Sequence, residues 1–192
     1  MTRLTTRPMR LLLVEFNELY ARHLCRHSQF GINVVHLLAL FAIWYAVYGL
    51  LYCVVGLEWV LAVPAFAYLA AVAPNVPMRV LAATTLFLGL IVAAACFVPA
   101  PWWGYLIIIP VTYKAQAWSH RYFTIESDMT EYNKKYAKGP ALFVVLLIYE
   151  VPLVLNFLLF AQSEPEALTK GMTFANASGS EEDQERAAAK AS

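Results

Sequence analysis

Hydrophobic residues gather into five long apolar segments along this chain, and short polar or proline-containing turns separate them. The segments are Val34–Val55, Leu57–Ala73, Met78–Val98, Trp102–Trp118 and Pro140–Ala161. A helix needs about 20 predominantly apolar residues to cross the hydrocarbon core of a bilayer. The pattern therefore predicts an all-α fold, a polytopic transmembrane helical bundle of about five spans.

The stretch before the first apolar segment follows a different period. The hydrophobic and histidine positions in it recur every three or four residues, namely Leu12, Phe16, Leu19, His23 and His27. This spacing places them on one face of a helix. We predict an amphipathic helix over residues 9–30 that lies on the membrane surface, with both histidines facing the bundle. Gly31 is expected to end this helix, and Asn33 to cap the start of the next one.

The remaining boundaries follow from composition. Residues 1–8 are expected to be a disordered lead, and 31–162 to form the transmembrane bundle. Within the bundle, residues 119–139 form a polar segment with a short helix expected from Asp128 to Lys138. Residues 163–192 are small, charged and without apolar periodicity, which predicts a disordered tail.

Composition supports the membrane interpretation and excludes other classes. The 192 residues are 60% hydrophobic and 14% charged, whereas soluble domains have about 45–50% apolar and roughly 25% charged residues. A net charge of +1 argues against a nucleic-acid partner, which needs a concentrated basic face. The three cysteines are widely spaced, so neither a disulfide framework nor a cysteine zinc site is expected.

The distribution of Lys and Arg predicts the orientation. With five spans, every Lys and Arg before residue 140 falls on one side of the membrane, and only three in the tail fall on the other. The positive-inside rule makes the first side cytoplasmic. The N-terminus and all four histidines are then cytoplasmic, and the C-terminal tail lies on the opposite side.

The histidines are the candidate chemistry, because neutral imidazole is a common ligand for iron and zinc. His23 and His27 are spaced to chelate one ion from one helix face, while His36 and His120 lie at the edges of two apolar segments. Histidines with one carboxylate and open positions suit ferrous iron and oxygen chemistry. The carboxylates nearby in the sequence are Glu15, Glu126, Asp128 and Glu131. The alternative is that the histidines are interfacial groups that bond lipid headgroups or backbone.

Glu150 is the second unusual residue, because it lies near the middle of the last apolar segment. A carboxylate at that depth is costly unless it is paired or protonated. One interpretation makes it a catalytic group that acts on substrate or protons. The other pairs it with Asn156, a tyrosine or Lys114 to stabilise helix packing.

Three stretches resemble a known family. His27, Asn33 and His36 open the first membrane helix, Gln116-Ala-Trp118-Ser-His120 ends the fourth, and Pro140-Ala-Leu142 opens the last. This pattern is similar to the membrane 2-hydroxy fatty acid dioxygenase family, of which the chain would be a divergent member. The resemblance implies an enzyme of fatty acid α-oxidation that uses ferrous iron and molecular oxygen to shorten a 2-hydroxy fatty acid by one carbon.

Together these features predict an iron-dependent membrane oxygenase that acts on a lipid or a 2-hydroxy fatty acid. The expected iron ligands are His27, His36 and His120, with His23 as a fourth ligand or a base, and Glu126 or Glu131 completing the sphere. The expected substrate-binding residues are Lys114, Arg121, Gln116 and Asn33. Gln116 is also expected to orient His120, and Lys114 or Arg121 to pair with the substrate carboxylate.

Two alternatives remain open from the sequence. The first is a non-enzymatic integral membrane protein, an assembly factor or lipid-binding partner, whose histidines and Glu150 are structural. The second is a proton-coupled role for Glu150, which the absence of a visible inverted repeat in the sequence disfavours.

Overall fold

The computed structural model describes residues 15–56, 58–123 and 139–160, and all regular structure within them is helical. The elements are α1 (Phe16–His27), α2 (Phe30–Val55), the short 3-10 helix η1 (Glu58–Leu61), α3 (Ala62–Val72), α4 (Met78–Phe97), α5 (Trp102–Tyr122) and α7 (Pro140–Phe160). The all-α class is therefore confirmed. The predicted lead, the helix at Asp128–Lys138 and the tail lie outside the described residues.

The helix ends agree closely with the apolar pattern in most places. The first long segment ends at Val55 as predicted, where Gly56 adopts a left-handed φ of 69° and its N–H bonds the Tyr52 carbonyl at 2.8 Å. A left-handed residue at this position terminates a helix, and glycine adopts it without steric cost. α5 runs four residues beyond the predicted end at Trp118, so His120 is held within a helix.

The junction between α1 and α2 differs from the prediction. α1 ends at His27 and α2 begins at Phe30. Gly31 and Asn33 therefore lie inside α2. The predictions that a helix ends at Gly31 and that Asn33 is an N-cap are wrong. Gly31 has a different role, because a Cβ atom there would lie 2.6 Å from ring atoms of Phe123. Its missing side chain lets the start of α2 approach the end of α5.

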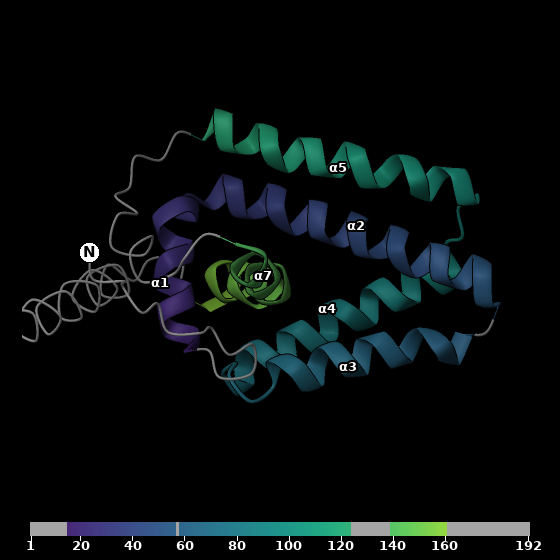
Figure 1. Ribbon diagram of the computed structural model, residues 1–192, viewed down its shortest axis with the longest axis horizontal. Helices are drawn as coiled ribbons and strands as arrows, with labels where there is room; N and C mark the ends of the chain where they lie inside the picture. The colour runs from purple at the N-terminus through teal and green to yellow at the C-terminus, as the bar shows by residue number, and fades with distance from the viewer. Residues whose placement is uncertain (1–14, 57, 124–138, 161–192) are drawn as a thin grey trace, which may run out of the picture.

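The helices form a bundle around α7 (Figure 1). α2 and α5 run side by side and make the most extensive helix contact. Gly49 permits this approach, because a Cβ atom there would overlap the buried ring of Tyr105. In the view of Figure 1, α7 is seen nearly end-on while α2 and α5 run across the picture, so α7 crosses them steeply. α1 lies across one end of the bundle.

α7 forms the centre of the core. Every residue from Val151 to Leu158 is buried, and the helix packs against α1, α2, α3 and α4. A helix that is apolar on all sides is typical of a buried core helix or a membrane span, and the second half of α7 is the buried part. α1 contributes to the enclosure with one buried face, which consists of Phe16, Leu19, Tyr20, Ala21, His23 and Leu24.

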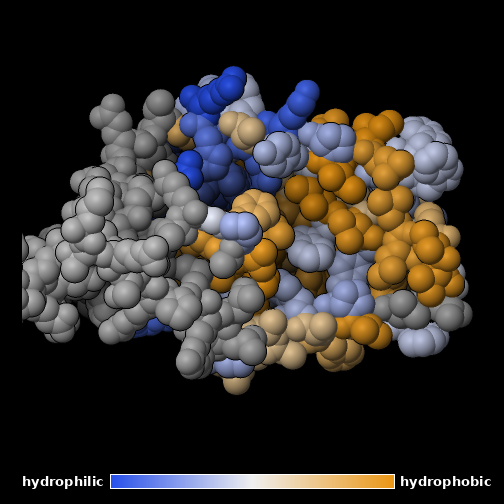
Figure 2. Space-filling view, viewed as in Figure 1, coloured by the Kyte–Doolittle hydropathy of each residue, from blue (hydrophilic) through white to orange (hydrophobic). Residues whose placement is uncertain are grey.

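The outer surface of the bundle is strongly apolar. Large hydrophobic side chains such as Leu38, Leu86, Leu106, Ile107 and Phe143 are exposed. Figure 2 shows hydrophobic colours over most of the described helices, with hydrophilic colours toward the C-terminal end of α5. Among the described residues, Phe30–Val55, Met78–Phe97 and Leu142–Phe160 are long and apolar enough to cross a membrane. These features are typical of an integral membrane protein.

Candidate metal centre

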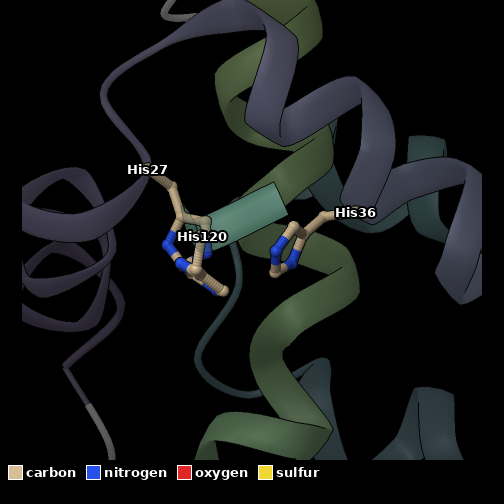
Figure 3. A group of neighbouring side chains, drawn as sticks. All are labelled: His27, His36 and His120. Atoms are coloured by element: carbon tan, nitrogen blue, oxygen red, sulfur yellow. The ribbon is translucent and has the colours of Figure 1, made fainter. Parts of the chain in front are cut away.

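Three imidazole side chains from three separate helices converge at one end of the bundle. His27 is the last residue of α1, His36 lies in the second turn of α2, and His120 lies in the last turn of α5. One nitrogen of each ring lies within 4.8 Å of the other two, and Figure 3 shows the three side chains pointing toward one another. Their ring centroids are 4.6, 4.9 and 5.0 Å apart, and the rings meet nearly at right angles.

This spacing is close to what a single metal ion requires. Metal–imidazole bonds are about 2.0–2.1 Å long, so two nitrogens on one ion are at most about 4.2 Å apart. Side-chain adjustments of less than about an ångström would bring the three nitrogens to bonding distance of one ion. The arrangement offers three imidazole donors to such an ion and would leave its other positions open.

A hydrogen bond orients the His36 ring. Its Nδ1 lies 2.9 Å from Oε1 of Glu150 on α7. A carboxylate accepts from Nδ1–H, and in the neutral form of the ring Nε2 then carries the lone pair. No described residue bonds the buried Nε2 of His36, so in the neutral ring this lone pair is available to a metal ion.

The His27 ring is oriented in the same sense. Its Nδ1 donates to the backbone carbonyl of His23 over 3.3 Å, one turn earlier in α1. Its Nε2 is also buried, and no residue that the structure describes bonds it. An unpaired buried polar atom costs about 1–3 kcal/mol. A metal ion bound by both lone pairs would offset this cost for the two nitrogens.

His23 lies beside this group and not within it. Its ring stacks on His27 with centroids 4.3 Å apart, and its Nε2 lies 2.9 Å from Oδ1 of Asn33. The Asn33 Nδ2 donates to the carbonyls of His27 at 2.6 Å and Gln29 at 2.8 Å. Oδ1 of Asn33 must then be the acceptor, so His23 Nε2 carries the proton and donates it.

Asn33 therefore joins α1 to α2. It is fully buried, and its oxygen and nitrogen are both occupied by the hydrogen bonds to His23, His27 and Gln29. The sequence suggested that Asn33 binds substrate and that His23 is a fourth ligand or a base. The structure places both in the hydrogen-bond network that supports His27.

Burial keeps the histidines of α1 neutral. It lowers the pKa of His23 to about 4. The hydrogen bond from His23 to Asn33 raises this pKa, but by less than burial lowers it. Burial also lowers the pKa of His27 far below its ordinary value, and the neighbouring imidazoles of His23, His36 and His120 lower it further. Neutral imidazole is the form that binds a metal ion.

The other predicted site residues fall in different places. Gln116 lies one turn before His120 on α5, and no described residue, His120 included, bonds its buried side-chain Nε2. Lys114 and Arg121 on α5 are exposed. Glu126 and Glu131 lie outside the described residues. The carboxylate that reaches a histidine of the cluster is Glu150, 114 residues from His36 in the sequence.

The sequence marked Glu150 as unusual but did not indicate His36 as its partner. The only local signal was a carboxylate in the middle of an apolar segment, with a histidine at the start of another. The two meet because α7 crosses α2 steeply, which brings the middle of one helix beside the beginning of the other (Figure 1). An apolar pattern does not encode a crossing angle, so this pairing is visible only in three dimensions.

Comparisons with known proteins add no further constraint to the site. No family model, curated protein or solved structure matches this chain.

Proposed function

We propose that the chain is an iron-dependent membrane oxygenase that acts on a lipid or a 2-hydroxy fatty acid. The observation that supports it most is the convergence of His27, His36 and His120 with two buried, unpaired Nε2 atoms. Three protein donors leave open positions on an ion that prefers six ligands, and non-haem iron oxygenases need such positions. The resemblance of the histidine motifs to the 2-hydroxy fatty acid dioxygenase family points to the same chemistry.

The residues of the chain have separate tasks in this proposal. The ligands of ferrous iron would be His27, His36 and His120. The bound iron would supply the redox chemistry with molecular oxygen, which the side chains of the site cannot supply. The carbonyl of His23 and the carboxylate of Glu150 orient two of the rings. Glu126 or Glu131 remains a predicted further ligand.

The substrate is proposed to approach along the membrane. Its acyl tail lies in the bilayer against the apolar outer surface between α2, α5 and α7, and its carboxylate pairs with Lys114 or Arg121. Both cations are exposed on α5, and Arg121 directly follows His120. Gln116 has a buried amide nitrogen without a partner one turn before His120, which suits a donor to an oxygen atom of the substrate.

The proposal includes an arrangement in the membrane. α3 and α5 join the three helices that are long and apolar enough to cross a membrane, and together they give five membrane-embedded segments, as the sequence predicts. The proposed orientation has the N-terminus and the histidine cluster on the cytoplasmic side and the tail on the other; the concentration of Lys and Arg before residue 140 supports it.

Oxygen consumption tests the proposed activity. Full-length protein in detergent, loaded with ferrous iron without oxygen and then given oxygen and a long-chain 2-hydroxy fatty acid, is expected to consume oxygen and release a product one carbon shorter. Protein loaded with zinc is expected to consume none, because zinc has no redox chemistry. Mass spectrometry of the fatty acid identifies the product.

His120→Ala treated in the same way is the matched control. Iron-loaded wild-type protein that consumes no more oxygen than this variant, with any lipid offered, would contradict the oxygenase. The non-enzymatic alternative, in which the histidines are structural, would then be favoured.

A further inference from the structure

We propose that Glu150 is a positioning residue, which acts through His36 to set the metal affinity of the site. It would not be a ligand, and it would not be the group that handles substrate or protons. The inference depends on the metal-binding part of the proposed function and does not depend on the oxygenase chemistry. Its basis is the 2.9 Å hydrogen bond from His36 Nδ1 to Glu150 Oε1.

The geometry separates Glu150 from the metal position. Nδ1 and Nε2 lie on different edges of the imidazole ring, and Glu150 occupies the Nδ1 edge of His36. No described residue bonds Nε2, so Nε2 is the nitrogen of His36 that is available to an ion shared with His27 and His120. The ring of His36 would therefore lie between the carboxylate and the ion. This is the usual arrangement when a metal-bound histidine donates its other ring N–H to a carboxylate.

Contacts from α3 and the turn after it hold the turn of α7 that carries Glu150. The Tyr68 hydroxyl on α3 donates to the carbonyl of Ile148 at 2.7 Å. The Tyr149 ring is fully buried, and its hydroxyl accepts a further bond from the Asn75 amide at 2.8 Å. The Tyr68 bond and the packing of the Tyr149 ring hold the backbone immediately before Glu150, so the carboxylate has a defined position relative to α2.

The position of Glu150 in an apolar helix requires a partner for its carboxyl group. An ionised group in an apolar helix is costly unless it has a partner, and Glu150 is only a quarter exposed. The bond to His36 offsets part of that cost and keeps the proton on Nδ1. A carboxylate partner also makes the imidazole a stronger donor to a metal ion, and loss of such partners weakens metal binding by about 10–100-fold.

Titration with Co²⁺ measures this role, because the visible absorption of Co²⁺ reports both its affinity and its ligands. The protein is full-length chain in detergent. Glu150→Gln keeps the size of the side chain and an oxygen that can accept from His36, so we expect about tenfold weaker binding. Glu150→Leu removes charge and acceptor together, and we expect about 100-fold weaker binding. Both variants are expected to keep the band positions of the wild type, since the three histidines remain.

Tyr149→Phe is the matched control, because it removes the hydrogen bond from Asn75 in the same turn of α7 without touching His36. Its Co²⁺ affinity is expected to stay within about twofold of wild type. Unchanged affinity in both Glu150 variants would overturn the inference. So would a shift of the Co²⁺ bands in Glu150→Gln, which would make Glu150 a ligand.

The same titration separates this inference from the proposed function. Wild-type protein that binds no Co²⁺ and no ferrous iron would overturn both. The wild-type protein could instead bind iron and consume no oxygen, while the Glu150 variants bind metal more weakly. This result would support the role of Glu150 and overturn only the oxygenase.

Discussion

Replacement of His120 or His36 by alanine is expected to abolish stoichiometric metal binding while the helical content of the chain is kept. Each variant removes one of three donors that lie within 4.8 Å of one another. Loss of a hydrogen-bond partner of a ligand lowers metal affinity by about 10–100-fold. Loss of a ligand itself should lower it further, so we expect a fall of more than about 100-fold. Elemental analysis of the purified protein, with circular dichroism for the helices, measures both effects.

His23→Ala is the matched control for these variants. His23 stacks on His27 and belongs to the same cluster of rings, but its Nε2 bonds Asn33 and does not face the metal position. We expect this variant to retain metal at nearly the wild-type ratio. Complete loss of metal in His23→Ala, or retention in both His36→Ala and His120→Ala, would contradict the assignment of the ligands.

Asn33→Leu is expected to give the largest loss of stability among single substitutions at the site. The change leaves two partners unpaired, the buried Nε2–H of His23 and the part-buried carbonyl of His27. Each buried group left without a partner costs about 1–3 kcal/mol, so we expect the free energy of unfolding to fall by about 2–5 kcal/mol. Reversible denaturation in detergent, with metal removed, measures this difference.

Thr84→Val provides the comparison for a buried polar group. Thr84 is fully buried on α4, and its hydroxyl donates to the Val80 carbonyl within the same helix. Its removal leaves no group of another helix unpaired, so we expect a loss below about 1 kcal/mol. Equal losses in the two variants would show that Asn33 does not join α1 to α2 as described.

The helices themselves could be predicted from the sequence because their signals are local. The apolar segment from Val34 ends at Val55 because Gly56 takes a left-handed conformation, and α4 and α7 begin at the residues that the apolar pattern indicated. Such limits depend on glycine, proline and the length of apolar runs. They need no knowledge of what packs against the helix.

The junction at Asn33 could not be predicted in the same way. An asparagine soon after a glycine is a typical helix start, yet Asn33 lies inside α2 and uses its side chain to hold the end of α1. Whether an asparagine caps its own helix or bonds another depends on what lies beside it. That neighbour, the last turn of α1, is set by tertiary packing.

The same limit applies to the site. The sequence predicted that His27, His36 and His120 would lie on one rim, and the structure brings them together. Glu126 and Glu131, the carboxylates predicted for the site, lie outside the described residues and stay predictions. Within the described residues, the carboxylate that bonds a histidine of the cluster is Glu150. Its place depends on the steep crossing of α7 and α2, which is a property of packed helices.

X-ray absorption of the metal-loaded protein tests the central claim most directly, because it reports the atoms bound to the ion. Ferrous or zinc protein is expected to show scattering from about three imidazole rings at roughly 2.0–2.2 Å, and about two in His120→Ala. A spectrum with no imidazole contribution, or one that His120→Ala leaves unchanged, would contradict a metal centre built from these three helices.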